Sequence, residues 1–455
     1  MGGSVSMSGE DGGGARHAVV VGAGIAGLLA ARVLTESFAR VTVLDRDALP
    51  AEAGPRRGVP QSRHAHGLLA RGFAVLHELF PGLADDLVAR GALVRDANAD
   101  VKWFSEGRRL SPTASDLACL LVSRPELEHY LRSQVAALPG VTIEDRCEVL
   151  EPVLAAGSTT RVAGVQVLRH GASQPQSLPA ELVVDATGRG NRGPVWLKAM
   201  GFAAPAEERI DSGLVYASRD YRRQPGDADA DAYLIAATAE VPRGGVALSG
   251  EGDRWLVTLF SMDGEAPPSD PATYLGFAGR LPVPDLHGLL ERWEPLGPPT
   301  LMRIPASIRR RYERLNRFPE GYLVIGDAIC QFNPTYGQGM TVAACEALAL
   351  RDSLAEGAGP DLAKRFFRRA ARITDVAWDM SVGGDLRFPS VEGRRTARVR
   401  LLNRYVARVN RVAVDDPQVA LTFLRVAHLQ APPQELLSPA MLRRVLRPVR
   451  TAAVS

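Results

Sequence analysis

The chain has 455 residues, of which 46% are hydrophobic and 23% charged, so it can bury a large core and is expected to form about two intertwined domains. Its 54 basic and 51 acidic residues leave a formal charge of +3, which is too balanced to favour nucleic acid as a partner. No apolar run is long enough to span a bilayer, and the start of the chain lacks the apolar centre of a signal peptide. We therefore expect a cytoplasmic protein with no membrane span. Four cysteines without CxxC spacing or histidine clusters indicate neither a metal site nor a disulfide framework.

The first predicted element is a strand, a tight turn and a helix over residues 18–36, AVVVGAGIAGLLAARVLTE. Gly22, Gly24 and Gly27 form GxGxxG at this junction, where they allow a tight turn, close approach of a pyrophosphate and close packing of the helix. Asp45 ends the next predicted strand, 40–44, where a carboxylate can accept hydrogen bonds from an adenosine ribose. The pattern predicts dinucleotide binding, and by itself it fits NAD as well as FAD.

Two further strands end in turns that carry Gly and Asp. The strand at 182–185 leads into DATGRGNRG, and the strand at 322–325 leads into GDAICQFNPTYGQGM. In the latter, Asp327 can accept hydrogen bonds from a ribityl chain, and Gly337 and Gly339 lead into a helix that begins near Met340. The N-terminus of that helix would face a flavin ring and stabilise the negative charge of its reduced form, which favours FAD over NAD. Together with the first turn, three strand ends carry such residues. Because the carboxyl ends of parallel strands lie at one edge of the sheet, they predict a single ligand site.

A long polar loop, AEAGPRRGVPQSRHAHG over residues 51–67, follows the second strand and is expected to be functional. His64 and His66 are alternate residues without nearby Cys or carboxylate partners, so they make a poor metal-ligand set. We expect them, with Arg63, to lie beside the cofactor and to shape access to it.

The remaining pattern completes an α/β fold: a Rossmann-type FAD-binding domain with an inserted antiparallel-sheet substrate domain and a helical C-terminal region. Residues 205–305 alternate β-rich pieces with Pro/Gly/Asp turns, and the chain turns helical after Pro360. The arginines at 443, 444, 447 and 450 are interpreted as a solvated helix face, with phosphate binding as the alternative. The predicted divisions are a disordered tail at 1–16, the FAD-binding domain at 17–204 and 306–360, the substrate domain at 205–305 and the helical region at 361–455.

Three of these motifs, VVVGAGIAG, DATG and GDA with PTYGQGM, resemble those of the flavoprotein monooxygenases built on the p-hydroxybenzoate hydroxylase fold. More narrowly, RRGVPQSRHAHGLLARG, VVDATGRGNRG and DSGLVYASR resemble the flavin epoxidases of polyether antibiotic biosynthesis, of the lasalocid and monensin type. The resemblance implies that Gly22, Gly24, Gly27 and Asp45 hold the ADP half of FAD. It also implies that Arg57 and Arg124 contact the cofactor, and that Asp327, Gly337, Gly339 and Met340 hold the ribityl-flavin half.

The resemblance further implies a monooxygenase that uses FAD, NAD(P)H as a transient reductant and O2, acting through a flavin hydroperoxide. The expected reaction is alkene epoxidation of an apolar, polyketide-derived small molecule. Hydroxylation of an aromatic or polyketide ring is the close alternative, and a prenyl-chain reductase is a remoter one. Flavin halogenases share the fold but carry a WxWxIP segment and a catalytic lysine. This chain lacks that segment, and its only lysines are Lys102, Lys198 and Lys364.

No side chain is predicted to act as a catalytic acid or base, because the cofactor performs the difficult chemistry. The substrate is expected to lie between the inserted sheet and the flavin. Candidate pocket residues are His66, Val215, Tyr216, Trp255 and Phe260, each of which also fits a place in the core. The sequence predicts neither the oligomeric state nor the identity of the substrate.

Overall fold

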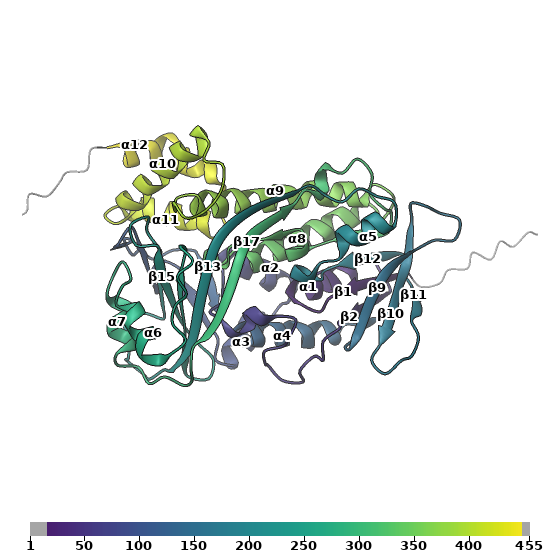
Figure 1. Cartoon of the computed structure of the whole chain (residues 1–455), viewed down its shortest axis with the longest axis horizontal. Coiled ribbons are helices and arrows are strands. Elements are labelled where there is room, and N and C mark those ends of the chain that lie inside the picture. Colours follow the sequence, from purple (N-terminus) through teal and green to yellow (C-terminus); the bar gives the residue numbers. More distant parts are fainter. Residues whose placement is uncertain (1–15, 448–455) are drawn as a thin grey trace, which may run out of the picture.

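The computed structural model describes residues 16–447, so Arg450 and all of the predicted tail except Arg16 lie outside the described residues. Figure 1 shows a parallel sheet with its helices at one end of the molecule and a larger sheet at the other, joined by the long strands β13 and β17. The helices α10 to α12 cover the upper side of the larger sheet in this view. No helix among the described residues is long and apolar enough to cross a membrane.

The parallel sheet has five strands in the order β18-β12-β1-β2-β8. Their short β-branched runs are largely buried, as expected of parallel strands covered on both faces. The strands are β1 (His17–Val21), β2 (Arg40–Leu44), β8 (Val141–Glu144), β12 (Leu182–Asp185) and β18 (Tyr322–Val324). Because β1 lies between β2 and β12, the strand order reverses beside β1, which is where open α/β sheets bind ligands. The predicted Rossmann-type domain is confirmed.

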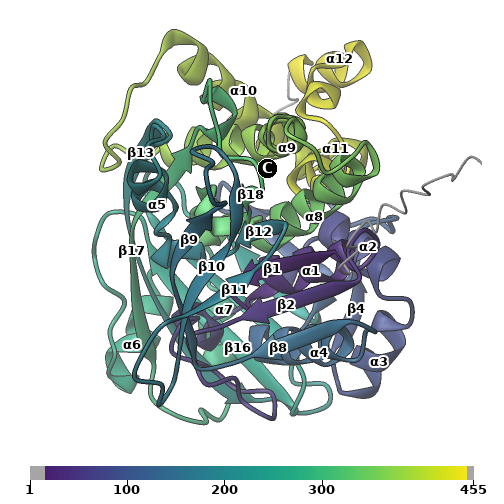
Figure 2. The ribbon, with the colours of Figure 1, turned by 90° about the vertical axis from the view of Figure 1, so that its right-hand side faces the viewer.

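Helices and a small antiparallel sheet cover the parallel sheet. Helix α1 packs against α4 and α8, and α8 also packs against α2 and α9. A meander in the order β11-β10-β9 contacts the sheet through β12 and β2. The elements are α1 (Ile25–Leu34), α2 (Ala70–Leu79), α4 (Arg124–Ala136), α8 (Gly339–Ala355), β9 (Cys147–Leu154), β10 (Val162–Arg169) and β11 (Gln176–Pro179). Figure 2 shows β9 to β11 crossing in front of the strands of the parallel sheet.

The larger sheet has eight strands in the order β19-β17-β13-β16-β15-β14-β5-β6. They are β5 (Val101–Ser105), β6 (Arg108–Arg109), β13 (Glu207–Arg222), β14 (Ala232–Ile235), β15 (Arg243–Gly250), β16 (Arg254–Ser261), β17 (Thr300–Arg310) and β19 (Cys330–Gln331). The sheet is therefore drawn from more of the chain than the predicted range 205–305. Strand β5 also pairs parallel to β14, so the sheet is antiparallel except at this one pair.

The two faces of the larger sheet have different neighbours. One face packs on α6 (Pro271–Ala278) and α7 (Asp285–Leu290) through an aromatic core in which Trp255 stacks on Trp293 at 4.6 Å between ring centroids. The other face turns toward the parallel-sheet region and the helical tail. Smaller elements complete the fold: β3 (Gly67–Leu68), β4 (Leu93–Asp96), β7 (Ala118–Leu121), α3 (Leu83–Ala89) and α5 (Gly193–Ala199).

The C-terminal region is helical, as predicted. It contains α9 (Leu362–Asp385), α10 (Ala397–Ala413), α11 (Pro417–Ala427) and α12 (Pro439–Leu446), with the 3-10 turn η6 (Pro433–Leu437) between the last two. The apolar residues Leu362, Phe366 and Ala370 of α9 are buried. One core joins Val409 and Leu424 of the tail to Val101 and Leu248 of the sheet. Helix α10 differs from α9, because its apolar residue Leu402 is exposed to solvent.

Candidate functional site

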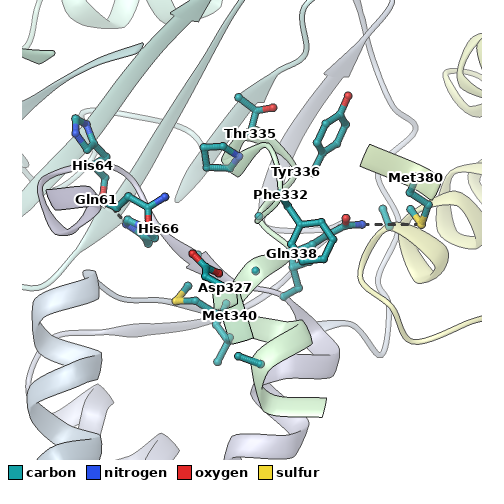
Figure 3. Close-up of a pocket in the computed structure, with 18 of the residues that line it drawn as sticks. Gln61, His64, His66, Asp327, Phe332, Thr335, Tyr336, Gln338, Met340 and Met380 are labelled. Atoms are coloured by element: carbon teal, nitrogen blue, oxygen red, sulfur yellow. Dashed lines mark hydrogen bonds between the residues drawn. The ribbon is translucent and has the colours of Figure 1, made fainter. Parts of the chain in front are cut away.

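A single cavity of about 1440 Å³ runs from the turns of the parallel sheet to the apolar face of the larger sheet. It brings together thirteen of the candidate site residues that the sequence singled out: Gly22, Gly24, Asp45, Arg57, His64, His66, Arg124, Tyr216, Phe260, Asp327, Gly337, Gly339 and Met340. Four others do not line it: Gly27, Arg63, Val215 and Trp255. Figure 3 shows Gln61, His64 and His66 along one side of the cavity, Tyr336, Gln338 and Met380 on the other, and Asp327 with Met340 between them.

The first turn has the geometry that a pyrophosphate requires. Gly22 has φ +108°, and a Cβ there would lie 2.6 Å from the carbonyl oxygen of Ala186. A Cβ at Gly27 would lie only 1.8 Å from the oxygen of Gly22, so this glycine allows α1 to pack on the turn and needs no contact with the cavity. A Cβ at Gly24 would meet nothing closer than 3.7 Å, because Gly24 faces open space. The backbone therefore presents an open cradle at the N-terminus of α1.

Asp45 lies at the end of β2 as predicted, but most of its acceptor capacity is already used. One oxygen accepts from the Ala23 amide at 2.8 Å and from Arg56 at 3.1 Å, and the other accepts from the Asp47 amide at 2.9 Å. A carboxylate has about four lone-pair positions, so about one remains for a ribose hydroxyl. Asp45 therefore fixes the first turn to the end of β2 in addition to facing the cavity.

Arg56 is the centre of a buried charge cluster that the sequence did not reveal. Its side chain is 7% exposed and pairs with Asp45 at 3.1 Å, with Asp47 at 3.2 Å and with Glu128 at 2.6 Å. Arg124, on the first turn of α4, contacts the other oxygen of Glu128 at 3.4 Å. The neighbouring Arg57 is exposed and lines the cavity. The two adjacent arginines thus have separate roles, one in holding the loop and one facing the ligand space.

The second turn ties the two strands beside it together. Asp185 is fully buried and accepts hydrogen bonds from the Thr187 amide at 3.0 Å and from the Tyr322 hydroxyl at 2.9 Å. Arg189 then extends from this turn to within 3.8 Å of Asp327 on the third turn. The predicted convergence of three strand ends is therefore present, since β1, β12 and β18 are neighbours whose turns line one cavity.

The third turn places Asp327 on the cavity wall, and a buried acid on α8 accepts a hydrogen bond from its backbone. Gly326, with φ +70°, donates its amide to Glu346 of α8 at 2.7 Å, and Thr374 of α9 donates to the other oxygen at 3.0 Å. Burial raises the pKa of Glu346 to about 7. Asp327 itself is only partly buried and lines the cavity.

A second buried acid accepts hydrogen bonds from the turn that precedes α8. Asp385, the last residue of α9, accepts from the Asn333 side-chain amide at 2.8 Å and from the Tyr336 hydroxyl at 3.1 Å. Its other oxygen is buried without a hydrogen-bond partner among the described residues, and burial raises the pKa of Asp385 to about 7. Gly337 follows with φ +68°, and α8 begins at Gly339. Asp385 therefore fixes the turn that delivers the N-terminus of α8 to the cavity.

The polar loop places two neutral histidines on the cavity wall. His66 Nδ1 donates to the carbonyl oxygen of His64 at 2.7 Å, since a carbonyl can only accept, so Nε2 is left as an acceptor. Burial, with Arg124 nearby, lowers the pKa of His66 to about 3. His64 contacts Ser218 at 2.8 Å, and burial lowers its pKa to about 4. This loop is thus anchored to the larger sheet through His64.

Beyond the histidines, the cavity is lined mainly by apolar side chains. Tyr216 and Phe260 come from the larger sheet, whereas Trp255 lies in the core on the other face. Neither Trp255 nor Val215 therefore lines this cavity. The helical tail supplies the opposite wall with Met380, Leu401, Leu402, Tyr405, Val406, Phe423 and Leu436. Sequence reasoning missed these residues, because an apolar stripe on a helix looks the same whether it meets a core or a cavity.

The residues present fit FAD. The open cradle at Gly24 and the N-terminus of α1 suit a pyrophosphate, because the first N–H groups of a helix have no intrahelical partners. Asp327 and the N-terminus of α8 lie at another part of the same cavity, where a sugar alcohol and a ring that gains negative charge can bind. The cavity also exceeds the range of about 300–1,000 Å³ typical of single ligand pockets, which leaves room for a substrate.

Comparisons with known proteins agree with this geometry. A family model described as an FAD binding domain matches residues 16–366. Protein Rv3254 of Mycobacterium tuberculosis (strain ATCC 25618 / H37Rv) is 37% identical over 396 residues, covering 84% of this chain and 82% of the relative. The flavin-dependent brominase Bmp2 has a similar structure, with a TM-score of 0.68 at 15% identity over 94% of this chain and 97% of that one. So does PqsL of Pseudomonas aeruginosa, a probable FAD-dependent monooxygenase, with a TM-score of 0.61 at 17% identity over 82% and 98%.

Proposed function

Because the chain belongs to the FAD-binding family of flavin-dependent monooxygenases, we propose that it transfers one atom of O2 to an apolar organic substrate. The observation that carries the proposal is the single cavity, which joins the FAD-binding turns to a large apolar chamber. Bound FAD would supply the redox chemistry, namely reduction by NAD(P)H and activation of O2. The protein's part is to bind the cofactor, to orient the substrate and to keep water away.

Each part of the cavity has a defined role in this proposal. The first turn and Arg57 bind the ADP half, and Asp327 accepts hydrogen bonds from the ribityl hydroxyls. The N-terminus of α8 at Gly339 and Met340 favours negative charge on the adjacent ring. The apolar walls around Tyr216 and Phe260 exclude water.

The favoured reaction is epoxidation of an alkene, with hydroxylation of an aromatic ring as the alternative. Ring hydroxylation of a phenol is helped by a base that removes the hydroxyl proton, whereas an alkene needs no base. The two histidines on the cavity wall, with pKa values of about 4 for His64 and about 3 for His66, are too weak as bases for a phenol. The resemblance to polyether epoxidases supports a polyketide-derived substrate.

Halogenation is a second candidate because Bmp2 is a brominase of the same fold. Flavin halogenases use a catalytic lysine, but none of Lys102, Lys198 and Lys364 lines the cavity. These are all the lysines of the chain. Oxygen transfer is therefore the better-supported reaction.

The test is the fate of oxygen. The purified FAD-loaded protein would be incubated with NADPH or NADH and with candidate polyenes and phenols under isotopically labelled O2, and the products analysed by mass spectrometry. We expect one labelled atom in an epoxide. A parallel reaction in labelled water with ordinary O2 should give unlabelled primary product. Oxidation of NADPH that depends on the substrate without label in the product would instead support the prenyl-chain reductase.

A further inference from the structure

The segment that follows α9 carries the positive charge of this protein. Residues 386–447 contain twelve arginines and four carboxylates, a net charge of +8, whereas the whole chain has +3. The rest of the chain is therefore net negative, at −5. Such asymmetry between regions indicates a surface that meets an anionic partner.

The arginines of α10 lie on its outer face. Arg400, Arg404 and Arg411 are spaced by four and seven residues, so they share one side of the helix, and all three are exposed. Arg408 lies between them and donates to the backbone oxygens of Val445 at 2.6 Å and Arg447 at 2.9 Å. This contact joins the outer face of α10 to the end of α12.

These cations are not neutralised within the described part of the protein. None of the outer arginines of α10 forms an ion pair there, and neither do Arg443 and Arg447 of the α12 segment. Their side-chain hydrogen bonds, where present, go to backbone oxygens, as in Arg443 to Pro439 at 3.2 Å. The surface thus presents free positive charge to solvent.

Exposed leucines lie next to these arginines on α10, η6 and α12, but Leu402, two residues from both Arg400 and Arg404, lies on the opposite side of α10. Leu401 is 69% exposed, Leu402 42%, Leu437 50% and Leu446 58%. The first three also line the cavity, so they form its rim where it meets solvent. The hydrogen bond from Tyr405 of α10 to the Leu436 oxygen of η6, at 2.5 Å, holds the two sides of this rim together. We call the outer face of α10, η6 and α12 the rim surface.

We propose that the rim surface docks on a membrane that contains anionic phospholipids, with its leucines in the interface and its arginines on the lipid phosphates. Basic amphipathic helices with exposed leucines bind such surfaces through apolar burial and charge together. The mouth of the apolar cavity would then open onto the bilayer, so a lipophilic substrate could enter without crossing water. A second copy of this chain fits less well, because a symmetric contact would bring arginines against arginines.

The test is sedimentation of the FAD-loaded full chain with vesicles, and it does not depend on the reaction proposed above. We expect binding to vesicles of phosphatidylcholine with phosphatidylglycerol, little binding to phosphatidylcholine alone, and loss of binding at high salt. The triple variant Arg404→Glu, Arg411→Glu, Arg443→Glu should lose at least tenfold in vesicle affinity. Leu446→Ser, which does not line the cavity, should weaken binding severalfold at unchanged charge.

The matched control reverses the same number of charges elsewhere. Arg40, Arg161 and Arg292 are exposed and form no ion pair with a described residue, so their replacement by Glu gives the same net charge away from the rim surface. This control should keep most of the vesicle binding, and all variants should retain FAD absorbance as a sign of folding. Equal loss in both triple variants, or no binding by the unaltered chain, would overturn the proposal. A dimer that the rim variant alone dissociates would assign the surface to a second copy instead.

Discussion

The two ends of the cavity are constructed in different ways. At the cofactor end, turns at the ends of three adjacent strands are fixed by glycines and by buried acids, namely Asp45, Asp185, Glu346 and Asp385. At the substrate end, the wall consists of apolar side chains from the larger sheet and from the helical tail, segments far apart in the chain. The first arrangement holds backbone groups in place, and the second can change its lining residue by residue. We therefore expect substitutions at the cofactor end to affect folding or FAD binding, and those at the substrate end to affect selectivity.

The largest expected effect is at Arg56. Replacing it by Met leaves Asp45, Asp47 and Glu128 without their shared cation, and breaking a buried ion pair typically costs about 3–5 kcal/mol. Urea unfolding would measure this loss. The matched variant Arg57→Met should keep the free energy of unfolding and lose FAD affinity, because Arg57 is exposed and faces the cavity. Similar stability loss in both variants would contradict the division of roles between these arginines.

The glycines of the first turn separate folding from binding. Gly27→Ala places a methyl group against the backbone oxygen of Gly22, and overpacking of this kind costs about 3 kcal/mol. Gly24→Ala places its methyl group 3.7 Å from Arg56, an ordinary contact, so the apo protein should keep its melting temperature while FAD affinity falls at least tenfold. Thermal unfolding and flavin titration measure the two effects. A Gly24 variant that binds FAD normally would show that the cofactor does not approach this turn.

Asp385 gives a pH dependence to the cofactor end. Its folded pKa of about 7 lies above the usual value of 3.8, so between these values the native state keeps a proton that the unfolded chain has released. Stability should therefore fall as the pH rises through this window, by about 1.4 kcal/mol per unit for one such group. The difference in unfolding free energy between the unaltered protein and Asp385→Asn should shift by about 2 kcal/mol from pH 5 to pH 6.5. Asp361→Asn, exposed at the start of the same helix, should keep the original slope; a parallel pH profile in both variants would refute the assignment.

The smallest expected effect distinguishes the two faces of β16. Phe260→Leu should change the KM for substrate severalfold with little loss of stability, because Phe260 lines the cavity. Trp255→Phe should cost about 1 kcal/mol of stability and leave KM unchanged, because Trp255 packs on Trp293 in the opposite core. Steady-state kinetics and thermal unfolding separate these outcomes. A KM change in the Trp255 variant alone would place the substrate on the other face.

The face of each strand residue was in principle readable from the sequence. Side chains alternate along a strand, so Trp255 and Phe260, five residues apart on β16, point to opposite faces, as do the neighbours Val215 and Tyr216 on β13. All four were nevertheless candidates for one pocket. Which of the two faces meets the cavity depends on how α6 and α7 cover the sheet, and no local pattern records that.

The strand-turn-helix units of the FAD-binding region can be read from local sequence. Their glycines, strand-end acids and β-branched runs act within a few residues of one another, so local chemistry specifies them. Other features appear only in the folded chain. Strand β5 pairs with the larger sheet, Arg56 forms ion pairs with three carboxylates, and Leu402 of the tail borders the cavity. These features arise where segments distant in the chain meet, and their partners depend on packing and on strand register. Composition and periodicity predict neither of these.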